Sequence, residues 1–188
     1  EAGSPNTGGA VALAAAIRQL SAVGMDQVAA HEAEVTAHTL ERPAALPEVR
    51  VYGDRDPHRA TQRLGVIPLQ LSTTHHFLAS AILGYEFGIG VRSGCFCAHP
   101  YILHLLGLSE AEAAQVRTDI LSGDRSDMPG LIRASFGLYN TLEEVDIFVD
   151  ALKRIARGDY QGEYQQELSS GEYTPLGWQP DYQRYFSL

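Results

Sequence analysis

Apolar and polar positions alternate along the chain with helical and strand periods in turn. In the N-terminal half, three helices are predicted, over residues 10–23, from Asp26 to about Leu40, and from Thr74 to Phe87. The first helix carries apolar residues three or four positions apart, and Gly24 can end it in the left-handed conformation. Apolar runs rich in Val, Ile and Leu predict four strands, at residues 49–52, 64–71, 89–92 and 131–136.

Two capping boxes mark helix starts in the C-terminal half. Ser109 with Glu112 predicts a helix through about Leu121, and Thr141 with Glu144 opens another. The second helix has a strong 3.6-residue apolar period at Val145, Phe148, Val149, Leu152 and Ile155. Helices that alternate with short strands favour an α/β or α+β domain with a small, mostly antiparallel sheet covered by helices.

A proline, a pair of histidines and a change in composition add three expectations. Pro68 lies inside the 64–71 strand, which indicates an edge strand or a bulge because proline cannot donate to a sheet. His75 and His76 open the third helix and are expected to cap it or to lie at the surface. After Gly158 the chain becomes rich in Gln, Gly, Tyr and Pro, which predicts an irregular tail over residues 158–188, packed by its aromatic side chains.

Composition narrows the class of protein. Of the 188 residues, 45% are hydrophobic and 20% charged, which is typical of a globular domain. The formal net charge of −9 argues against nucleic acid and anionic membranes as partners, and no run approaches the ~18 apolar residues of a membrane span. No secretory signal is visible and there are only two cysteines, so a reducing cytoplasm is expected. The chain opens on Glu1 rather than methionine, which indicates a piece of a longer protein.

The segment over residues 91–100 (Val-Arg-Ser-Gly-Cys-Phe-Cys-Ala-His-Pro) holds both cysteines. A cysteine that handles sulfur must be an accessible thiolate, and Arg92 and His99 can supply positive charge beside Cys95 and Cys97. Burial as packing residues is the plain alternative, since free cysteine is often buried. A zinc site would use these two cysteines with His99 and His104, but a Cys-x-Cys spacing is not the usual one.

Two further segments are candidates for binding anions. Arg133 lies in an otherwise apolar strand, where its guanidinium would suit a carboxylate. An internal salt bridge is the alternative for this residue. The segment over residues 1–9 (Glu-Ala-Gly-Ser-Pro-Asn-Thr-Gly-Gly) precedes a helix, so Ser4 and Asn6 either belong to an anion site or cap the helix.

Taken in order, these three segments resemble the C-terminal region of cysteine desulfurases and their class V aminotransferase relatives. Those proteins are pyridoxal-phosphate enzymes of fold type I. The resemblance extends from Glu1 to about Arg157. The Gly-Cys-Phe-Cys motif is also similar to that of molybdenum-cofactor sulfurases of the same superfamily.

The resemblance implies a role for each segment. Cys97 falls at the position of the persulfide-forming cysteine, with Cys95 and His99 as accessory residues. Arg133 matches the arginine that binds the substrate carboxylate, and Arg92 matches one that lines the active site. Ser4 and Asn6 match a segment that reaches the cofactor phosphate of the neighbouring subunit. Residues 1–9 would therefore belong to the cofactor side, residues 10–157 to the small domain and residues 158–188 to the tail.

For the intact enzyme, the resemblance implies pyridoxal phosphate, a small amino-acid substrate, a homodimer and a sulfur-acceptor protein. The family's cofactor lysine precedes the region present here, and the single lysine, Lys153, has none of its sequence context. The chain alone is therefore expected to be inactive. The stretch over residues 101–130 is longer than in compact desulfurases. Two alternatives stay open: a transaminase, lyase or epimerase without sulfur transfer, and a non-catalytic module that binds a partner.

Overall fold

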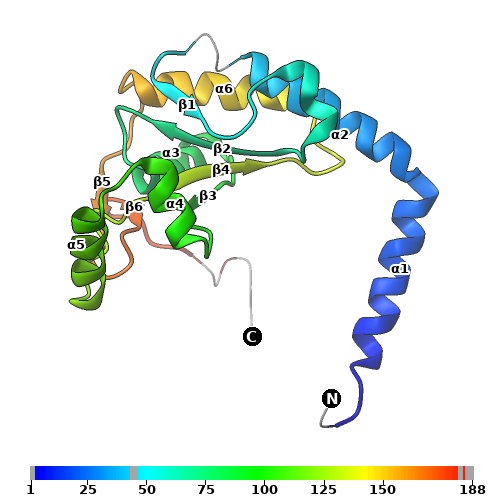
Figure 1. The fold of residues 1–188 in the computed structure, drawn as a ribbon, viewed down its shortest axis with the longest axis horizontal. Coiled ribbons are helices and arrows are strands. Elements are labelled where there is room, and N and C mark those ends of the chain that lie inside the picture. The colour runs from blue at the N-terminus through cyan, green and yellow to red at the C-terminus, as the bar shows by residue number, and fades with distance from the viewer. Residues whose placement is uncertain (1–2, 43–45, 182–183, 185–188) are drawn as a thin grey trace.

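The computed structural model describes residues 3–42, 46–181 and 184. Its centre is a four-stranded sheet with the order β1-β2-β4-β3, in which every neighbouring pair is antiparallel. The strands are β1 (Val49–Val51), β2 (Val66–Leu71), β3 (Arg92–Gly94) and β4 (Leu131–Ser135). The predicted fold class, a short antiparallel sheet with helices packed on it, is confirmed (Figure 1).

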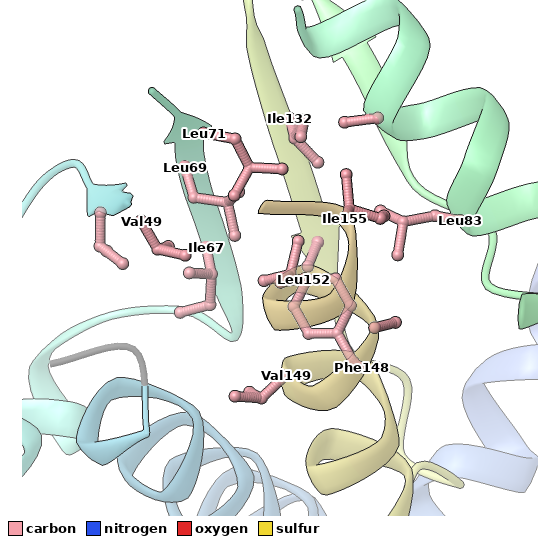
Figure 2. Packing of buried hydrophobic residues seen from close by; sticks show 14 of the residues in the cluster. Val49, Ile67, Leu69, Leu71, Leu83, Ile132, Phe148, Val149, Leu152 and Ile155 are labelled. Carbon is pink, nitrogen blue, oxygen red and sulfur yellow. The ribbon is translucent and has the colours of Figure 1, made fainter. Parts of the chain in front are cut away.

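Three helices cover one face of this sheet: α2 (Met25–Glu41), α3 (His76–Phe87) and α6 (Leu142–Ala156). Figure 2 shows the core between them, where alternate residues of β2 meet the apolar stripe of α6. The five apolar residues that predicted this helix are all buried. Each such side chain contributes about 1.5–3 kcal/mol when it is fully buried. Because the core covers this face of the sheet, the opposite face remains for other contacts.

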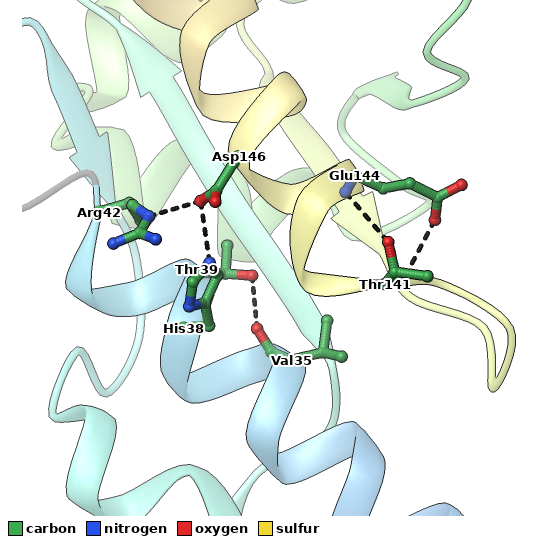
Figure 3. Close-up of polar contacts among 7 residues, drawn as sticks. All are labelled: Val35, His38, Thr39, Arg42, Thr141, Glu144 and Asp146. Carbon is green, nitrogen blue, oxygen red and sulfur yellow. Dashed lines mark hydrogen bonds and ion pairs between the residues drawn. The ribbon is translucent and has the colours of Figure 1, made fainter.

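Polar contacts join α2 to α6 and fix the start of α6. Thr141 Oγ1 accepts a hydrogen bond from the Glu144 amide at 3.3 Å, and the Glu144 carboxylate accepts one from the Thr141 amide at 3.1 Å, as the sequence predicted (Figure 3). Asp146 on α6 accepts hydrogen bonds from Arg42 and His38 at the end of α2. The predicted capping box at Ser109 is also present and opens α5 (Glu110–Leu121).

The prediction for Pro68 is wrong, because β2 lies inside the sheet between β1 and β4. The Pro68 carbonyl accepts a hydrogen bond from the Tyr52 amide at 2.9 Å, one residue beyond the end of β1. In an antiparallel ladder, the N–H and C=O of one residue point to the same neighbour. The missing donor of Pro68 therefore faces the place where β1 stops pairing, and only one ladder bond is lost.

Several elements differ from the prediction. The strand expected at residues 89–92 begins only at Arg92 and runs into Gly94, because Ile89 and Val91 pack against the core without pairing. Helix α4 (His99–Leu106) and the 3₁₀ helix η2 (Pro57–Gln62) were not predicted. The tail is not wholly irregular, since β5 (Tyr164–Gln166) and β6 (Tyr173–Pro175) pair as an antiparallel hairpin.

Helix α1 (Thr7–Val23) projects from the body of the domain and buries none of its residues (Figure 1). Among the described residues, no single helix is long and apolar enough to cross a membrane. Only α1 and α2 together reach that length and composition, and they are bent by 75° relative to each other.

Candidate functional site

The two cysteines lie in a tight turn between β3 and α4. The Ala98 amide donates to the Cys95 carbonyl at 2.8 Å, so Phe96 and Cys97 are the central residues of a four-residue turn. Their φ angles are +52° and +61°, the left-handed values that a type I′ turn needs at both positions. Two bulky residues rarely adopt this conformation. The turn places Cys97 at the surface while Cys95 is buried.

Cys95 is held from behind by the loop that precedes β4. Its thiol donates a hydrogen bond to the Pro129 carbonyl at 3.0 Å, and burial raises the pKa of the thiol. It packs with Leu131 and Ile102 in a small apolar cluster on the second face of the sheet. A buried thiol with a raised pKa is a poor nucleophile. Cys95 therefore has the environment of a structural residue and Cys97 that of an accessible one.

Two arginines stand opposite each other on the same face of the sheet. Arg92 on β3 pairs in register with Arg133 on β4, so both side chains leave the sheet on the side away from the α2–α3–α6 core. Like charges at directly opposite positions destabilise a sheet unless an anion lies between them. The four strands contain no acidic residue that could compensate. This arrangement is suited to binding an anion.

Arg133 has no ionic partner within the described parts of the chain. Its guanidinium carbon lies 5.2 Å from the centre of the Phe96 ring, an arrangement that favours a cation–π contact. Its Nε atom is buried and lacks a hydrogen-bond partner. The internal salt bridge that was the alternative role for Arg133 is therefore not formed among the described residues. An unpaired buried donor is costly and indicates a site built for an acceptor.

His76 contacts the loop that precedes β4, and the sequence did not predict this contact. It is not a cap or surface residue: only 5% of it is exposed, and its Nε2 donates to the Met128 carbonyl at 2.8 Å. Burial lowers its pKa to about 4, so the ring is neutral near pH 7. His75 stacks on it at 4.2 Å between ring centroids. Nothing in the local sequence indicated this burial, because Met128 lies 52 residues further along the chain.

The N-terminal candidates lie apart from the cysteine turn. Asn6 is the N-cap of α1, where its side chain accepts a hydrogen bond from the Gly9 amide at 2.9 Å. Ser4 and Asn6 are both exposed. Figure 1 shows this end of α1 directed away from the sheet. Glu1 and Ala2 of the same motif lie outside the described residues.

His99 begins α4 and is exposed, as is Arg92 on the neighbouring strand. In the part of the chain that the structure describes, no three His, Cys, Asp or Glu side chains are grouped as a metal ion would require. The zinc reading of the two cysteines with His99 and His104 therefore has no support from the geometry.

Comparisons with known proteins agree on one family. Residues 1–148 match the family described as "Aminotransferase class-V". The chain is 35% identical over 157 residues to a cysteine desulfurase of Escherichia coli O127:H6, and 33% identical over the same length to one of Escherichia coli K12. Each alignment covers 84% of this chain and 32% of the relative.

Solved structures give the same result. The apo cysteine desulfurase from Thermococcus onnurineus NA1 superposes with a TM-score of 0.66 at 33% identity, covering 84% of this chain and 33% of that one. The S-sulfonic acid form of the cysteine desulfurase CsdA from Escherichia coli gives 0.63 at 25% identity, covering 86% and 33%. The chain thus spans about a third of the length of the relatives it matches.

Proposed function

Because the chain belongs to the class V aminotransferase family, we propose that it forms the C-terminal part of a pyridoxal-phosphate-dependent cysteine desulfurase. The observation that carries the proposal is the pairing of an accessible cysteine, Cys97, with an arginine, Arg133, whose buried Nε has no partner. The ring of Phe96, between the two cysteines, lies against that guanidinium. Phe96, the residue before Cys97, therefore packs on the group that we propose binds the anion.

The substrate carboxylate is the anion that this site would bind. A guanidinium can grip a carboxylate with two parallel hydrogen bonds, and the orphaned Nε of Arg133 is one donor of such a fork. Arg92, directly opposite, would add a second positive charge, and the bound anion would offset the repulsion between the two arginines.

Pyridoxal phosphate is implied by the family, and part of this chain fits it. The exposed hydroxyl of Ser4, close before the positive end of the α1 dipole, suits a phosphate. Asn6 already spends its side-chain oxygen on the Gly9 amide, so it would shape this end of the helix. Lys153 lies in the last turn of α6, so the cofactor lysine would be supplied from outside this chain. When bound, the cofactor acts as an electron sink for the substrate.

The chemical step assigned to this chain belongs to Cys97. Its thiolate forms an S–S bond with the substrate sulfur while the bond between that sulfur and the substrate Cβ breaks. Cys97 is left as a persulfide, and protonation of Cβ gives alanine. The sulfur would then pass to an acceptor. The isolated chain would be inactive, because it lacks the cofactor lysine.

Substitution of each cysteine in the full-length protein tests the proposal. Cys97→Ser should abolish release of alanine from L-cysteine, and of sulfide in the presence of a thiol reductant, while the bound cofactor keeps its absorbance. Cys95→Ser should retain most of the activity, because a serine hydroxyl can keep the hydrogen bond that this buried thiol donates to the Pro129 carbonyl. The persulfide can be read by mass spectrometry as one added sulfur atom on the tryptic peptide 93–117.

Reversed effects, or no effect of either change, would contradict the persulfide assignment. Turnover of other amino acids by transamination, elimination or epimerisation would then assign the protein to another activity of its family. A full-length protein that neither binds the cofactor nor turns over amino acids would be the non-catalytic module.

A further inference from the structure

The hairpin formed by β5 and β6 is fastened to the loop over residues 122–130. The Arg125 amide donates to the Leu168 carbonyl at 2.8 Å, and its guanidinium donates to the Ser169 carbonyl at 3.0 Å. From the hairpin, the side-chain Nε2 of Gln166 donates to the carbonyls of Ser126 and Gly171, at 2.8 and 3.0 Å. One side chain of β5 thus ties the loop to the hairpin and to Gly171, in the connection that leads to β6.

Close packing seats the hairpin against α3 as well. Gly171 has φ +78°, and a Cβ at this position would lie 2.5 Å from both the Arg125 carbonyl oxygen and the ring of Phe77. Only glycine fits such a contact. Glu86 on α3 accepts hydrogen bonds at 2.9 Å from the amides of Gln161 and Gly162 and from the Tyr164 hydroxyl. The hairpin is therefore held at both ends.

The same loop supports the cysteine turn from its other side. The Met128 carbonyl accepts from His76, and the Pro129 carbonyl accepts from the Cys95 thiol. At Gly130, a Cβ would lie 2.6 Å from the Cα of Gly94. A continuous series of contacts therefore leads from the hairpin through the loop to Cys95.

The turn needs this support because its backbone is strained. Phe96 and Cys97 both have positive φ, which non-glycine residues keep only where the surroundings hold them there. Of the contacts around them, the Cys95 thiol hydrogen bond fixes the start of the turn from the loop side. Freeing the loop would let the turn relax and would move the Cys97 thiol.

We propose that the C-terminal hairpin is a positioning element for the cysteine turn, with Gln166 and Arg125 as the positioning residues. The proposal rests on the proposed function insofar as Cys97 is the reacting group. The hairpin lies beyond residues 1–148, the part of the chain that matches the family, so the family match does not supply this role.

Protection of Cys95 from alkylation measures the hold on the turn without using enzyme activity. In the full-length protein carrying Cys97→Ser, N-ethylmaleimide labelling of the tryptic peptide 93–117 reports on Cys95 alone. Gln166→Ala should raise the labelling rate about tenfold, the effect of losing roughly one net hydrogen bond on local opening. Gln165→Ala is the matched control, since Gln165 is exposed and is the next residue along the same strand.

With Cys97 intact, Gln166→Ala should lower kcat for desulfuration while KM for cysteine stays within about twofold, because Arg133 binds the carboxylate from β4 and not from the turn. An unchanged midpoint of thermal unfolding would separate this effect from general destabilisation. Arg125→Ala should act in the same direction, because it removes the contact with Ser169.

The proposal is overturned if Gln166→Ala and Arg125→Ala leave Cys95 as protected as Gln165→Ala does. It is also overturned if protection is lost while kcat is unchanged. If the parent protein does not desulfurate cysteine at all, the proposed function fails, and the alkylation rates alone decide whether the hairpin holds the turn.

Discussion

Cys95 and Cys97 are two residues apart in sequence but have opposite environments. In a regular strand, residues i and i+2 point to the same side. Here the left-handed pair at Phe96 and Cys97 reverses the chain, so that one thiol faces the Pro129 carbonyl and the other faces solvent. The choice between the two cysteines made from the family motif therefore has an independent physical basis in burial.

Replacing Arg133 tests the carboxylate role. In the full-length enzyme, Arg133→Ala should lower kcat/KM for cysteine by an amount equivalent to about 2–5 kcal/mol, the range for removing one partner of a buried charge pair. Arg133→Lys should restore only part of this, because a point charge cannot form the fork. Arg50→Ala is a suitable control, since Arg50 lies on the same face of the sheet and its guanidinium lies over the ring of Tyr52. If kcat/KM is unchanged in both Arg133 variants, the residue has only a structural role.

His76 should make the stability of the domain depend on pH. Burial lowers its pKa from 6.5 to about 4 in the folded state, so below pH 6.5 the unfolded chain takes up a proton that the folded chain does not. The free energy of unfolding should therefore fall as the pH decreases from 6.5 towards 4, by about 2 kcal/mol between pH 7 and pH 5. His76→Gln, which keeps a donor for the Met128 carbonyl, should flatten this part of the profile. Urea unfolding at the two pH values measures it, and equal slopes in both proteins would contradict the assignment.

At the residue scale, the sequence was enough to choose candidate side chains but not to predict their surroundings. Cys97, Arg92 and Arg133 lie in short segments whose neighbouring residues already indicate a chemical role. The sequence alone was therefore enough to make them candidates. The orphaned Nε of Arg133 and the burial of His76 depend on strand register and on a distant loop, which no local pattern contains.

At the element scale, α5 and α6 have the same cap but different surroundings. Both begin with a complete capping box, yet α6 buries six residues in the core and α5 buries none. Cap chemistry depends on local sequence, so both helix starts were predicted. Whether a helix packs in the core depends on its apolar face, and of these two helices only α6 has a strong apolar face.

This difference predicts unequal effects of removing the two caps. Thr141→Ala should lower the free energy of unfolding of the domain by about 1 kcal/mol. Ser109→Ala should fray α5 locally and leave global unfolding within about 0.5 kcal/mol of the parent, because α5 packs little surface against the core. Chemical denaturation followed by circular dichroism measures both. Equal losses would show that α5 unfolds together with the core.

Helix α4 and the β5–β6 hairpin were not predicted, because each has only a weak signal in its local sequence. Helix α4 has only eight residues, although the proline in its first turn and the left-handed Gly107 after it are recognisable boundaries. The β5–β6 hairpin has strands of three residues with no apolar alternation, and it is stabilised by contacts with α3 and the loop at Arg125. Such contacts join segments that are far apart in sequence.

At the scale of the whole molecule, α1 is an apolar helix that buries none of its residues against the described part of the chain. Val11, Leu13 and Ile17 are 68%, 62% and 54% exposed, and the helix contacts α2, the next helix along the chain. Ser4 and Asn6, at its start, are not brought to the cysteine turn. If they contribute to a cofactor site, as the family resemblance implies, that site does not contain the cysteine turn of the same small domain, which agrees with a site shared between two subunits.

Mixing two inactive variants of the full-length protein tests this sharing. One variant carries Cys97→Ser, and the other carries Ser4→Asp, which would place a negative charge against the cofactor phosphate. If each site takes Cys97 from one subunit and Ser4 from the other, a mixed dimer contains one site with both residues intact. Unfolding and refolding an equal mixture should then restore about a quarter of the parent activity, because half of the dimers are mixed and half of their sites are intact. Each variant refolded alone is the control and should stay inactive. If both residues served the same site within one chain, every chain in the mixture would carry a defect, and no activity would return.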